Sequence, residues 1–222
     1  MKKEKLKILY QDKDIIVVSK DTNLLTIGTE REKENTLYHK VLMYERSKHK
    51  GNKIFIVHRL DKETSGVIVF AKNEKVKNIL QDNWDNYAVE RKYVAVVEGK
   101  VSKKEDEIIS YLKENSVHKV YSTKDKDGKL AVTKYKVLNT SKSFSLLDIE
   151  IKTGRKNQIR VHLNDIGYPI IGDKKYGSKY NPLRRLGLHA YKLVLKHPIS
   201  NEIMTFEDEL PKEFINMFKK NS

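Results

Sequence analysis

The chain has 222 residues, enough for one large or two small domains whose buried core needs no disulfide or metal to hold it together. It contains no cysteine, which excludes disulfides and thiolate metal sites and fits a reducing compartment. Lysine and arginine number 45 against 30 aspartate and glutamate residues, a formal net charge of +15. This excess leaves two interpretations open: a polyanionic partner such as nucleic acid, or a lysine-rich composition without such a partner.

The N-terminal residues 1–7 are basic, as at the start of a signal peptide, but no apolar segment follows them. No stretch of the sequence approaches the length of a membrane span. We therefore expect a cytoplasmic protein that makes no contact with a membrane.

The first part of the chain predicts a β-hairpin followed by a helix. Residues 6–10 and 15–19 are short apolar runs separated by a polar turn, which is typical of two paired strands. Residues 28–35 are polar and predict a loop. Apolar residues then recur at helical spacing over residues 36–48, and Asn35 is the expected N-cap.

A short polar loop follows between two β-branched runs. Residues 54–57 and 67–71 have the composition of buried strands, and the loop between them carries Asp61 close to Arg59. Gly66 can adopt a positive φ at the corner, and the two hydroxyl side chains before it can bond to the loop backbone. A rigid element that presents one ionisable group is what a catalytic site requires.

The sequence of this loop, residues 58–66, resembles the HRLD-x-x-TSG signature of the RluA-type RNA pseudouridine synthases and matches every fixed position. The resemblance implies that Asp61 is the catalytic residue. It also implies that four of its neighbours bind substrate: His58, Arg59, Leu60 and Thr64. Without the resemblance, Asp61 would be interpreted as a carboxylate that caps a solvated turn.

One turn departs from the family pattern. The family has Lys-Pro-x-Gly after the second strand, where this chain has Lys20, Asp21, Thr22 and Asn23. Asparagine tolerates the left-handed region, so Asn23 can replace the glycine. The missing proline costs the turn some stiffness.

Asn73 is the expected N-cap of a helix that runs to about residue 83 or 88. We expect the single tryptophan, Trp84, to pack in the core rather than to stack on a base. Residues 92–98 predict a strand, and the Arg-Lys-Tyr sequence at its start resembles a family element. The resemblance implies that Tyr93 stacks near the target base; on its own, Tyr93 would be a core residue at a strand edge.

The middle of the chain is rich in predicted strands. Residues 105–112 are ambiguous, whereas 119–122 and 129–138 predict a hairpin whose turn contains Asp127-Gly128. Residues 143–151 predict a further strand. A group of lysines around the hairpin turn forms either a phosphate-contacting edge or a solvated tip: Lys119, Lys124, Lys126 and Lys129.

A second motif, residues 153–163, resembles the family sequence Thr-Gly-Arg-x-x-Gln-Ile-Arg-x-His. Asn157 is the expected N-cap of a helix that ends at Gly167. The apolar residues Ile159, Leu163 and Ile166 share one face of this helix. The resemblance implies that Arg160 pairs with the catalytic aspartate. It also implies that two further side chains bind substrate: Arg155 and Gln158.

The C-terminal part carries weaker family features. Residues 169–177 resemble a Gly-Asp-x-x-Tyr-Gly loop, and residues 188–198 resemble a Leu-His-Ala strand with a His-Pro turn. We expect His162 and His189 to be hydrogen-bonded structural residues. A last strand at 203–207 and a helix opened by Pro211 complete the chain.

The strand-rich pattern predicts an α+β fold, and the resemblance implies its detail: a central mixed, mostly antiparallel sheet flanked by helices, with Asp61 in a basic cleft. We expect a single catalytic domain over residues 1–222, with too little chain before it for an N-terminal S4 domain. The implied activity is isomerisation of uridine to pseudouridine in ribosomal or transfer RNA by a monomer. The resemblance implies no metal and no cofactor.

The implied chemistry breaks a glycosidic bond, turns the uracil and rejoins it through carbon 5. Asp61 would stabilise positive charge on the ribose or attack it covalently, and the target base would be flipped out of the RNA. Arg59 would fill the vacated space and Tyr93 would stack on the base. Two other functions remain open: a non-catalytic RNA-binding module, and a DNA-binding regulator, for which no helix-turn-helix or zinc pattern is present.

Overall fold

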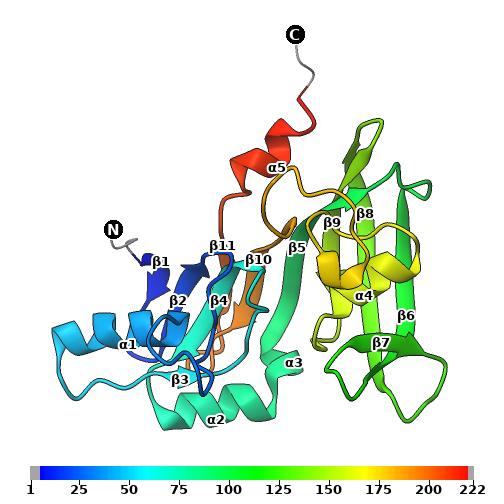
Figure 1. The fold of residues 1–222 in the computed structure, drawn as a ribbon. Coiled ribbons are helices and arrows are strands. Elements are labelled where there is room, and N and C mark those ends of the chain that lie inside the picture. The colour runs from blue at the N-terminus through cyan, green and yellow to red at the C-terminus, as the bar shows by residue number, and fades with distance from the viewer. Residues whose placement is uncertain (1–5, 220–222) are drawn as a thin grey trace. The chain divides into compact units, whose positions relative to one another are not determined.

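A computed structural model of the chain describes residues 6–219 (Figure 1). Residues 1–5 lie outside the described residues. They belong to the basic segment 1–7 that resembles the start of a signal peptide. The chain divides into two compact units. Of the described residues, the first unit contains 6–89 together with Ala190–Asp208, and the second contains Glu90–His189 together with residues 209–219.

The first unit is built on a sheet with the strand order β1-β2-β4-β10, in which β11 pairs with β10 and β3 pairs with β4. The strands span β1 Lys7–Gln11, β2 Ile15–Lys20, β3 Phe55–Ile56, β4 Ser65–Ala71, β10 Leu188–Lys196 and β11 Ile203–Glu207. The expected hairpin of β1 and β2 is confirmed, and β2 runs antiparallel to β4 with Lys20 opposite Gly66. The expected strand at 54–57 is shorter than predicted, because only two of its residues pair with β4 before the chain turns into the loop.

Three helices belong to this unit: α1 Leu37–Lys48, α2 Glu74–Asp82 and α3 Trp84–Tyr87. Asn73 caps α2 as expected, since its side chain accepts a hydrogen bond from the Val76 amide at 2.9 Å. The predicted cap of α1 is wrong by one residue. Thr36, not Asn35, has the extended backbone of a cap, and its hydroxyl accepts from the His39 amide at 3.1 Å.

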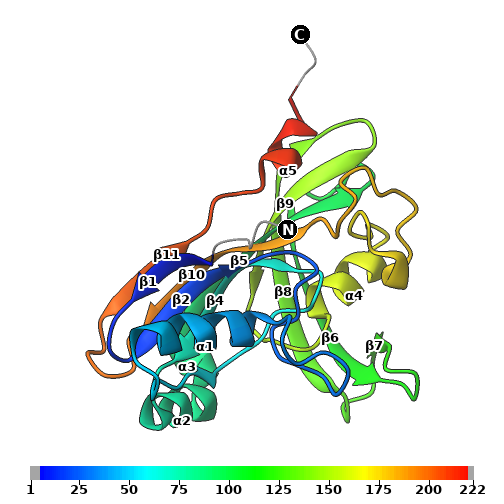
Figure 2. The same ribbon diagram turned by 60° about the vertical axis from the view of Figure 1, so that its left-hand side comes forward.

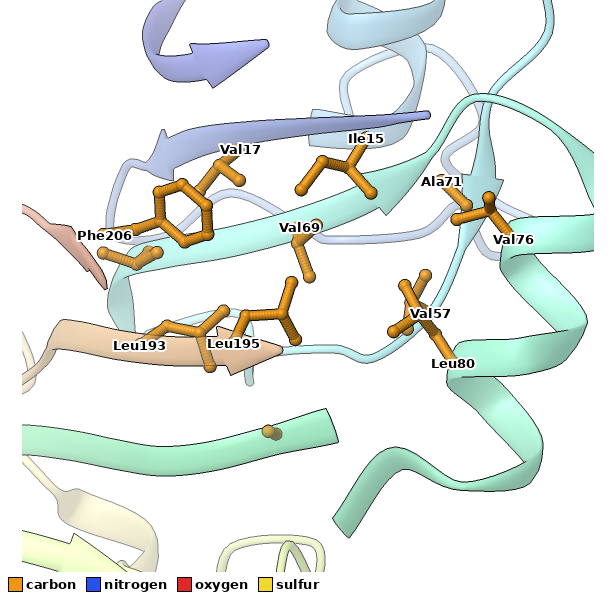
Figure 3. Close-up of a cluster of buried hydrophobic side chains, with 12 residues drawn as sticks. Ile15, Val17, Val57, Val69, Ala71, Val76, Leu80, Leu193, Leu195 and Phe206 are labelled. Atoms are coloured by element: carbon orange, nitrogen blue, oxygen red, sulfur yellow. The ribbon is translucent and has the colours of Figure 1, made fainter. Parts of the chain in front are cut away.

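The core of the first unit lies between its sheet and α2 (Figure 3). Ile15, Val17 and Val69 of the sheet belong to one cluster with Val76 and Leu80 of the helix, and all five are buried. The residues that alternate with these along the strands are buried as well, namely Ile16, Val18, Ile68 and Phe70. Because alternate residues of a strand face opposite sides, both faces of this sheet are covered.

The second unit contains the strand order β5-β9-β8-β6-β7, with every ladder antiparallel. The strands span β5 Ala88–Glu98, β6 Glu105–Glu114, β7 Val120–Thr123, β8 Lys129–Thr140 and β9 Phe144–Ile151. The predicted hairpin of 119–122 with 129–138 is wrong, because β7 and β8 lie on opposite sides of β6. Tyr111 of β6 pairs with Thr123 on one side and Leu130 on the other, so the Asp127-Gly128 segment crosses the end of β6.

Helix α4, Gln158–Asp165, packs on one face of this sheet beside β8 (Figures 1 and 2). Ile159 and Leu163 enter the same core as Ile149 of β9, and Gly167 at φ 84° ends the helix region as expected. The unit also contains a 3₁₀ turn, Lys174–Tyr176, and helix α5, Lys212–Asn216. The α+β class is confirmed. Over residues 6–219, no helix combines the length and the apolar character that crossing a membrane requires.

Candidate active site

Asp61 lies in the loop that joins β3 to β4. Leu60 and Thr64 are buried, whereas Asp61 is half-buried. The Thr64 amide donates to the Asp61 carbonyl at 3.1 Å, which closes a tight turn around the carboxylate residue. Arg59 is exposed. The loop therefore presents Asp61 from a backbone that is fixed by its neighbours in sequence.

Gly66, directly after the loop, occupies a position that only glycine fits. Its φ is +118°, and a Cβ atom placed there would lie 2.0 Å from the carbonyl oxygen of Ala190 in β10. The expectation of a positive φ at this corner is confirmed. The absence of a side chain lets the backbones of β4 and β10 approach each other at the base of the loop.

His58 is engaged by the protein rather than extended into solvent. Its ring stacks on Trp84, with centroids 4.4 Å apart and an interplanar angle of 20°, and its Nε2 accepts a hydrogen bond from the Val69 amide at 3.1 Å. Trp84 also packs against the core of the first unit, so its expected packing role is confirmed. These contacts brace the start of the loop against β4 and α3.

Lys20 is a residue that sequence reasoning missed. It is fully buried, and its ammonium donates to the carbonyl oxygens of Asp21 at 3.0 Å, Leu24 at 2.6 Å and Lys62 at 2.9 Å. The signal that could have found it is its position at the start of the turn at residues 20–23, where this chain keeps the lysine of the family's Lys-Pro-x-Gly sequence. In that turn Asn23 has φ 59°, so its expected left-handed conformation is confirmed.

On α4, the side chain of Arg160 is buried and held by Asp173. Nε donates to Asp173 Oδ2 at 2.7 Å and a terminal nitrogen donates to Oδ1 at 2.8 Å, which makes a bidentate pair. The guanidinium also lies 5.1 Å from the ring centre of Tyr176. Sequence reasoning missed Asp173, although the Gly-Asp-x-x-Tyr-Gly resemblance placed it in a family loop.

Asn157 precedes α4 as expected, but its expected capping bond is wrong. Its φ is 54° and its side chain makes no cap hydrogen bond. Instead Nδ2 donates to the Tyr176 hydroxyl at 3.0 Å, and Oδ1 accepts from Arg160 at 3.3 Å. The left-handed backbone turns this side chain toward the Arg160 pair and away from the amides at the start of the helix.

Gln158 is buried, and protein partners use the hydrogen-bonding capacity of its amide. Nε2 donates to Val132 O at 3.0 Å and to Thr133 Oγ1 at 2.9 Å, while Oε1 accepts from Thr153 Oγ1 at 2.7 Å and from the Arg155 amide at 3.1 Å. A direct bond from Gln158 to a substrate would have to replace one of these four. The network joins the loop before α4 to strand β8.

Tyr93 lies on β5, paired with Ile149 of β9, and packs against the core that α4 enters. Two residues earlier, Arg91 donates to the Lys152 carbonyl at 2.8 Å. Its guanidinium also lies 3.2 Å from the point where a Cβ of Gly154 would be. The start of β5 is therefore beside the loop that leads into α4. Asp61 belongs to the first unit, whereas Tyr93 and Arg160 belong to the second. The expected association of Asp61 with these two residues therefore stays a prediction.

A polar pocket of about 350 Å³ opens between β6, β8 and the loop before α4. Four of its lining residues are cationic: Lys113, Lys129, Arg155 and Lys156. Arg155 is exposed, and its Nε donates to the Leu130 carbonyl at 3.0 Å. Lys113 pairs with Asp125 and Asp127, and these partners raise the pKa of Lys113. The ion pairs of Lys113 do not decide between the two interpretations of the lysines at 119, 124, 126 and 129, which form either a phosphate-contacting edge or a solvated tip.

Among the residues that the structure describes, one group has the spacing of a metal site: Asp12, Asp14 and His197. Asp12 Oδ1 already accepts from the amides of Asp14 and Ile15, at 2.7 and 2.8 Å. His197 Nδ1 accepts from the Ser200 amide at 3.1 Å, so the neutral ring carries its proton on Nε2. That nitrogen lies 3.0 Å from Asp12 Oδ2, so the two side chains contact each other directly.

Comparison with known proteins identifies the family. The sequence profile described as RNA pseudouridylate synthase matches residues 14–165. YhcT of Bacillus subtilis, an uncharacterized RNA pseudouridine synthase, is 34% identical over 96% of this chain and 71% of its own. Ribosomal large subunit pseudouridine synthase C of Rickettsia bellii is 35% identical over 93% of this chain and 69% of its own.

The fold agrees with that assignment. The solved structure of human RNA pseudouridylate synthase domain containing 4 superposes with a TM-score of 0.78 at 25% identity, over 94% of this chain and 90% of that one. The profile covers both the Asp61 loop and the Arg160 helix. The chain therefore belongs to the RNA pseudouridine synthases, in their RluA-type branch.

Proposed function

We propose that Asp61 is the catalytic carboxylate with which this enzyme isomerises uridine in structured RNA. The observation that carries this proposal is the Asp61 loop, a half-exposed carboxylate on a backbone fixed between β3 and β4. The turn closed by Thr64 supports it, because its hydrogen bond restricts the backbone of Asp61 and thereby the direction of the carboxylate. A preorganised carboxylate is what the reaction needs at the ribose.

In the proposed reaction the glycosidic bond from carbon 1′ to nitrogen 1 breaks, and the detached uracil turns within the site. Carbon 5 then bonds to carbon 1′ and loses its proton, while nitrogen 1, left with the electron pair of the broken bond, takes up a proton, so that the product is an isomer of the starting uridine. Asp61 either stabilises the positive ribose or bonds to it for a time, and both routes require the ionised carboxylate. Tyr93 stacks on the base, which must leave the RNA stack to be reached, and Arg59 fills the space it vacates.

Arg160 is proposed to pair with Asp61, since a guanidinium beside a carboxylate favours its charged form. The bidentate bond to Asp173 supports this role. It holds the plane of the guanidinium in one orientation, so little side-chain freedom is lost when a further hydrogen bond forms. Gln158 is proposed to act through the loop before α4, because its amide bonds hold that loop to β8.

The proposed substrate is ribosomal or transfer RNA, bound by a monomer in the cytoplasm through one catalytic domain made of both units. The net charge of +15 supports a polyanionic substrate. The pocket that contains Lys129 and Arg155 is proposed to take a backbone phosphate. Relatives named ribosomal large subunit synthases, such as that of Buchnera aphidicola at 32% identity, support ribosomal RNA among the candidates.

The test is a map of pseudouridines in cellular RNA from a strain without this gene. We expect at least one site to lose its modification, to regain it with the wild-type gene and to stay unmodified with Asp61→Ala. Glu74→Ala, an exposed carboxylate at the start of α2, is the matched control and should restore the site. Restoration by Asp61→Ala would contradict the assigned role.

A further inference from the structure

The loop that carries Asp61 is held by side chains from an earlier segment, residues 20–26. Thr26 Oγ1 donates to the Leu60 carbonyl at 2.8 Å, and Thr22 Oγ1 donates to the Glu63 carbonyl at 2.7 Å. The Lys20 ammonium bonds to a third carbonyl between them. Backbone acceptors on both sides of Asp61 are therefore tied to the same segment.

The two peptide groups that flank the Asp61 Cα atom are both fixed. The carbonyl of the preceding group, from Leu60, accepts from Thr26, and the carbonyl of the following group, from Asp61 itself, accepts from the Thr64 amide at 3.1 Å. Because peptide groups are planar, the orientations of these two planes determine φ and ψ of Asp61. They thereby determine the direction in which its side chain leaves the backbone.

Thr26 is itself held in place. It is 4% exposed, and its carbonyl accepts from the Tyr38 amide at 3.1 Å. The Leu25 carbonyl accepts from the Leu37 amide at 2.8 Å, so the segment is attached to the first turn of α1. The hydroxyl of Thr26 thus links a helix terminus to the peptide group before Asp61.

We propose that Thr26 is a positioning residue for the reaction, with Thr22 as a second and weaker one. The inference rests on the proposed catalytic role of Asp61. The hydroxyls act on a backbone carbonyl and not on the RNA, so their loss slows the chemical step without weakening binding. The turn that contains Thr22 has Asp21 where a proline would restrict φ, and the hydrogen bond to Glu63 supplies a restraint in its place.

The test is the single-turnover rate at saturating RNA. Thr26→Val removes the hydroxyl and keeps the shape of the side chain, and a displacement of about 1 Å lowers rates by roughly a hundredfold. We expect Thr26→Val to be about tenfold to a hundredfold slower, with the RNA dissociation constant within about twofold of wild type. Thr26→Ser, which restores the hydroxyl, should recover most of the rate, and Thr22→Val should show a smaller loss.

Two controls separate positioning from a loss of stability. Val17→Ala opens the core of the first unit and should lower the melting temperature without slowing the reaction. Thr205→Val replaces an exposed threonine on β11 and should change neither quantity. All rates are compared at a temperature where each variant is folded. If Thr26→Val does not fold, the rates of Thr26→Ser and Thr22→Val are compared with wild type instead.

A wild-type rate in folded Thr26→Val would overturn the inference, as would a Thr26→Ser variant as slow as Thr26→Val. If Thr26→Val does not fold, a wild-type rate in Thr22→Val overturns it. Each of these results leaves the proposed function intact, provided that Asp61→Ala is inactive in the same assay. An active Asp61→Ala would instead overturn the proposed function itself.

Discussion

His162 makes the stability of the protein depend on pH in a way that can be calculated. The ring is buried in α4, with Nδ1 2.9 Å from Thr133 Oγ1 and Nε2 2.9 Å from Ser110 Oγ. Burial lowers the pKa of His162 from 6.5 to about 4. The folded protein therefore keeps this ring neutral at pH values where the unfolded chain protonates it.

The sign and size of the effect follow from the two pKa values. Because the folded pKa is depressed, the stability that the neutral ring provides is complete above about pH 6.5 and is lost as the pH falls toward 4. A pH of 5 lies about 1.5 pH units below the pKa of His162 in the unfolded chain. Each such unit stabilises the protonated unfolded chain by about 1.4 kcal/mol relative to the folded protein, whose ring stays neutral. The expected loss from this one residue is about 2 kcal/mol of unfolding free energy between pH 7.5 and pH 5.

Urea unfolding at pH 7.5 and pH 5.0 measures this loss, with His162→Gln to isolate it from other titrating groups. Wild type should lose about 2 kcal/mol more than His162→Gln between the two pH values. His49→Gln replaces an exposed histidine and should lose as much as wild type. Equal losses in wild type and His162→Gln would refute the reasoning.

Three further substitutions test other parts of the structure. Gly66→Ala places a Cβ 2.0 Å from the Ala190 carbonyl at positive φ, so we expect a loss of at least about 3 kcal/mol by urea unfolding; near-wild-type stability would contradict the close approach. Asp173→Ala breaks a buried bidentate pair with Arg160, and it should cost about 3–5 kcal/mol and slow the reaction in the protein that remains folded; an unchanged rate would argue against a positioning role. Lys129→Ala should weaken RNA binding and reduce the slope of log affinity against log salt by about 0.7–0.9, whereas an unchanged slope would exclude a phosphate contact at this lysine.

The features that the sequence predicted well are local ones. Short apolar runs rich in β-branched residues predicted β2 and β4, and Asn73 predicted the start of α2 because a cap needs only its own helix. Gly66 and Asn23 were correctly expected at positive φ, since these residue types tolerate that conformation. Each of these expectations depends on neighbours within a few residues.

The features that the sequence did not predict depend on distant parts of the chain. A turn signal at Asp127-Gly128 cannot reveal that β6 lies between the strands it joins. Asp173 and Arg160 are 13 residues apart, and only the packing of α4 brings them together. Thr26 reaches the Leu60 carbonyl across 34 residues, so nothing in its local sequence marks it.

The central claim is that Asp61 performs the chemistry while other residues hold the RNA. Its most direct test is the release of tritium from RNA labelled at carbon 5 of uridine, measured with RNA binding on the same samples. Wild type and Glu74→Ala should release tritium, and Asp61→Ala should release none while binding RNA with nearly unchanged affinity. Release by Asp61→Ala, or binding without release by wild type on every RNA tested, would contradict the account.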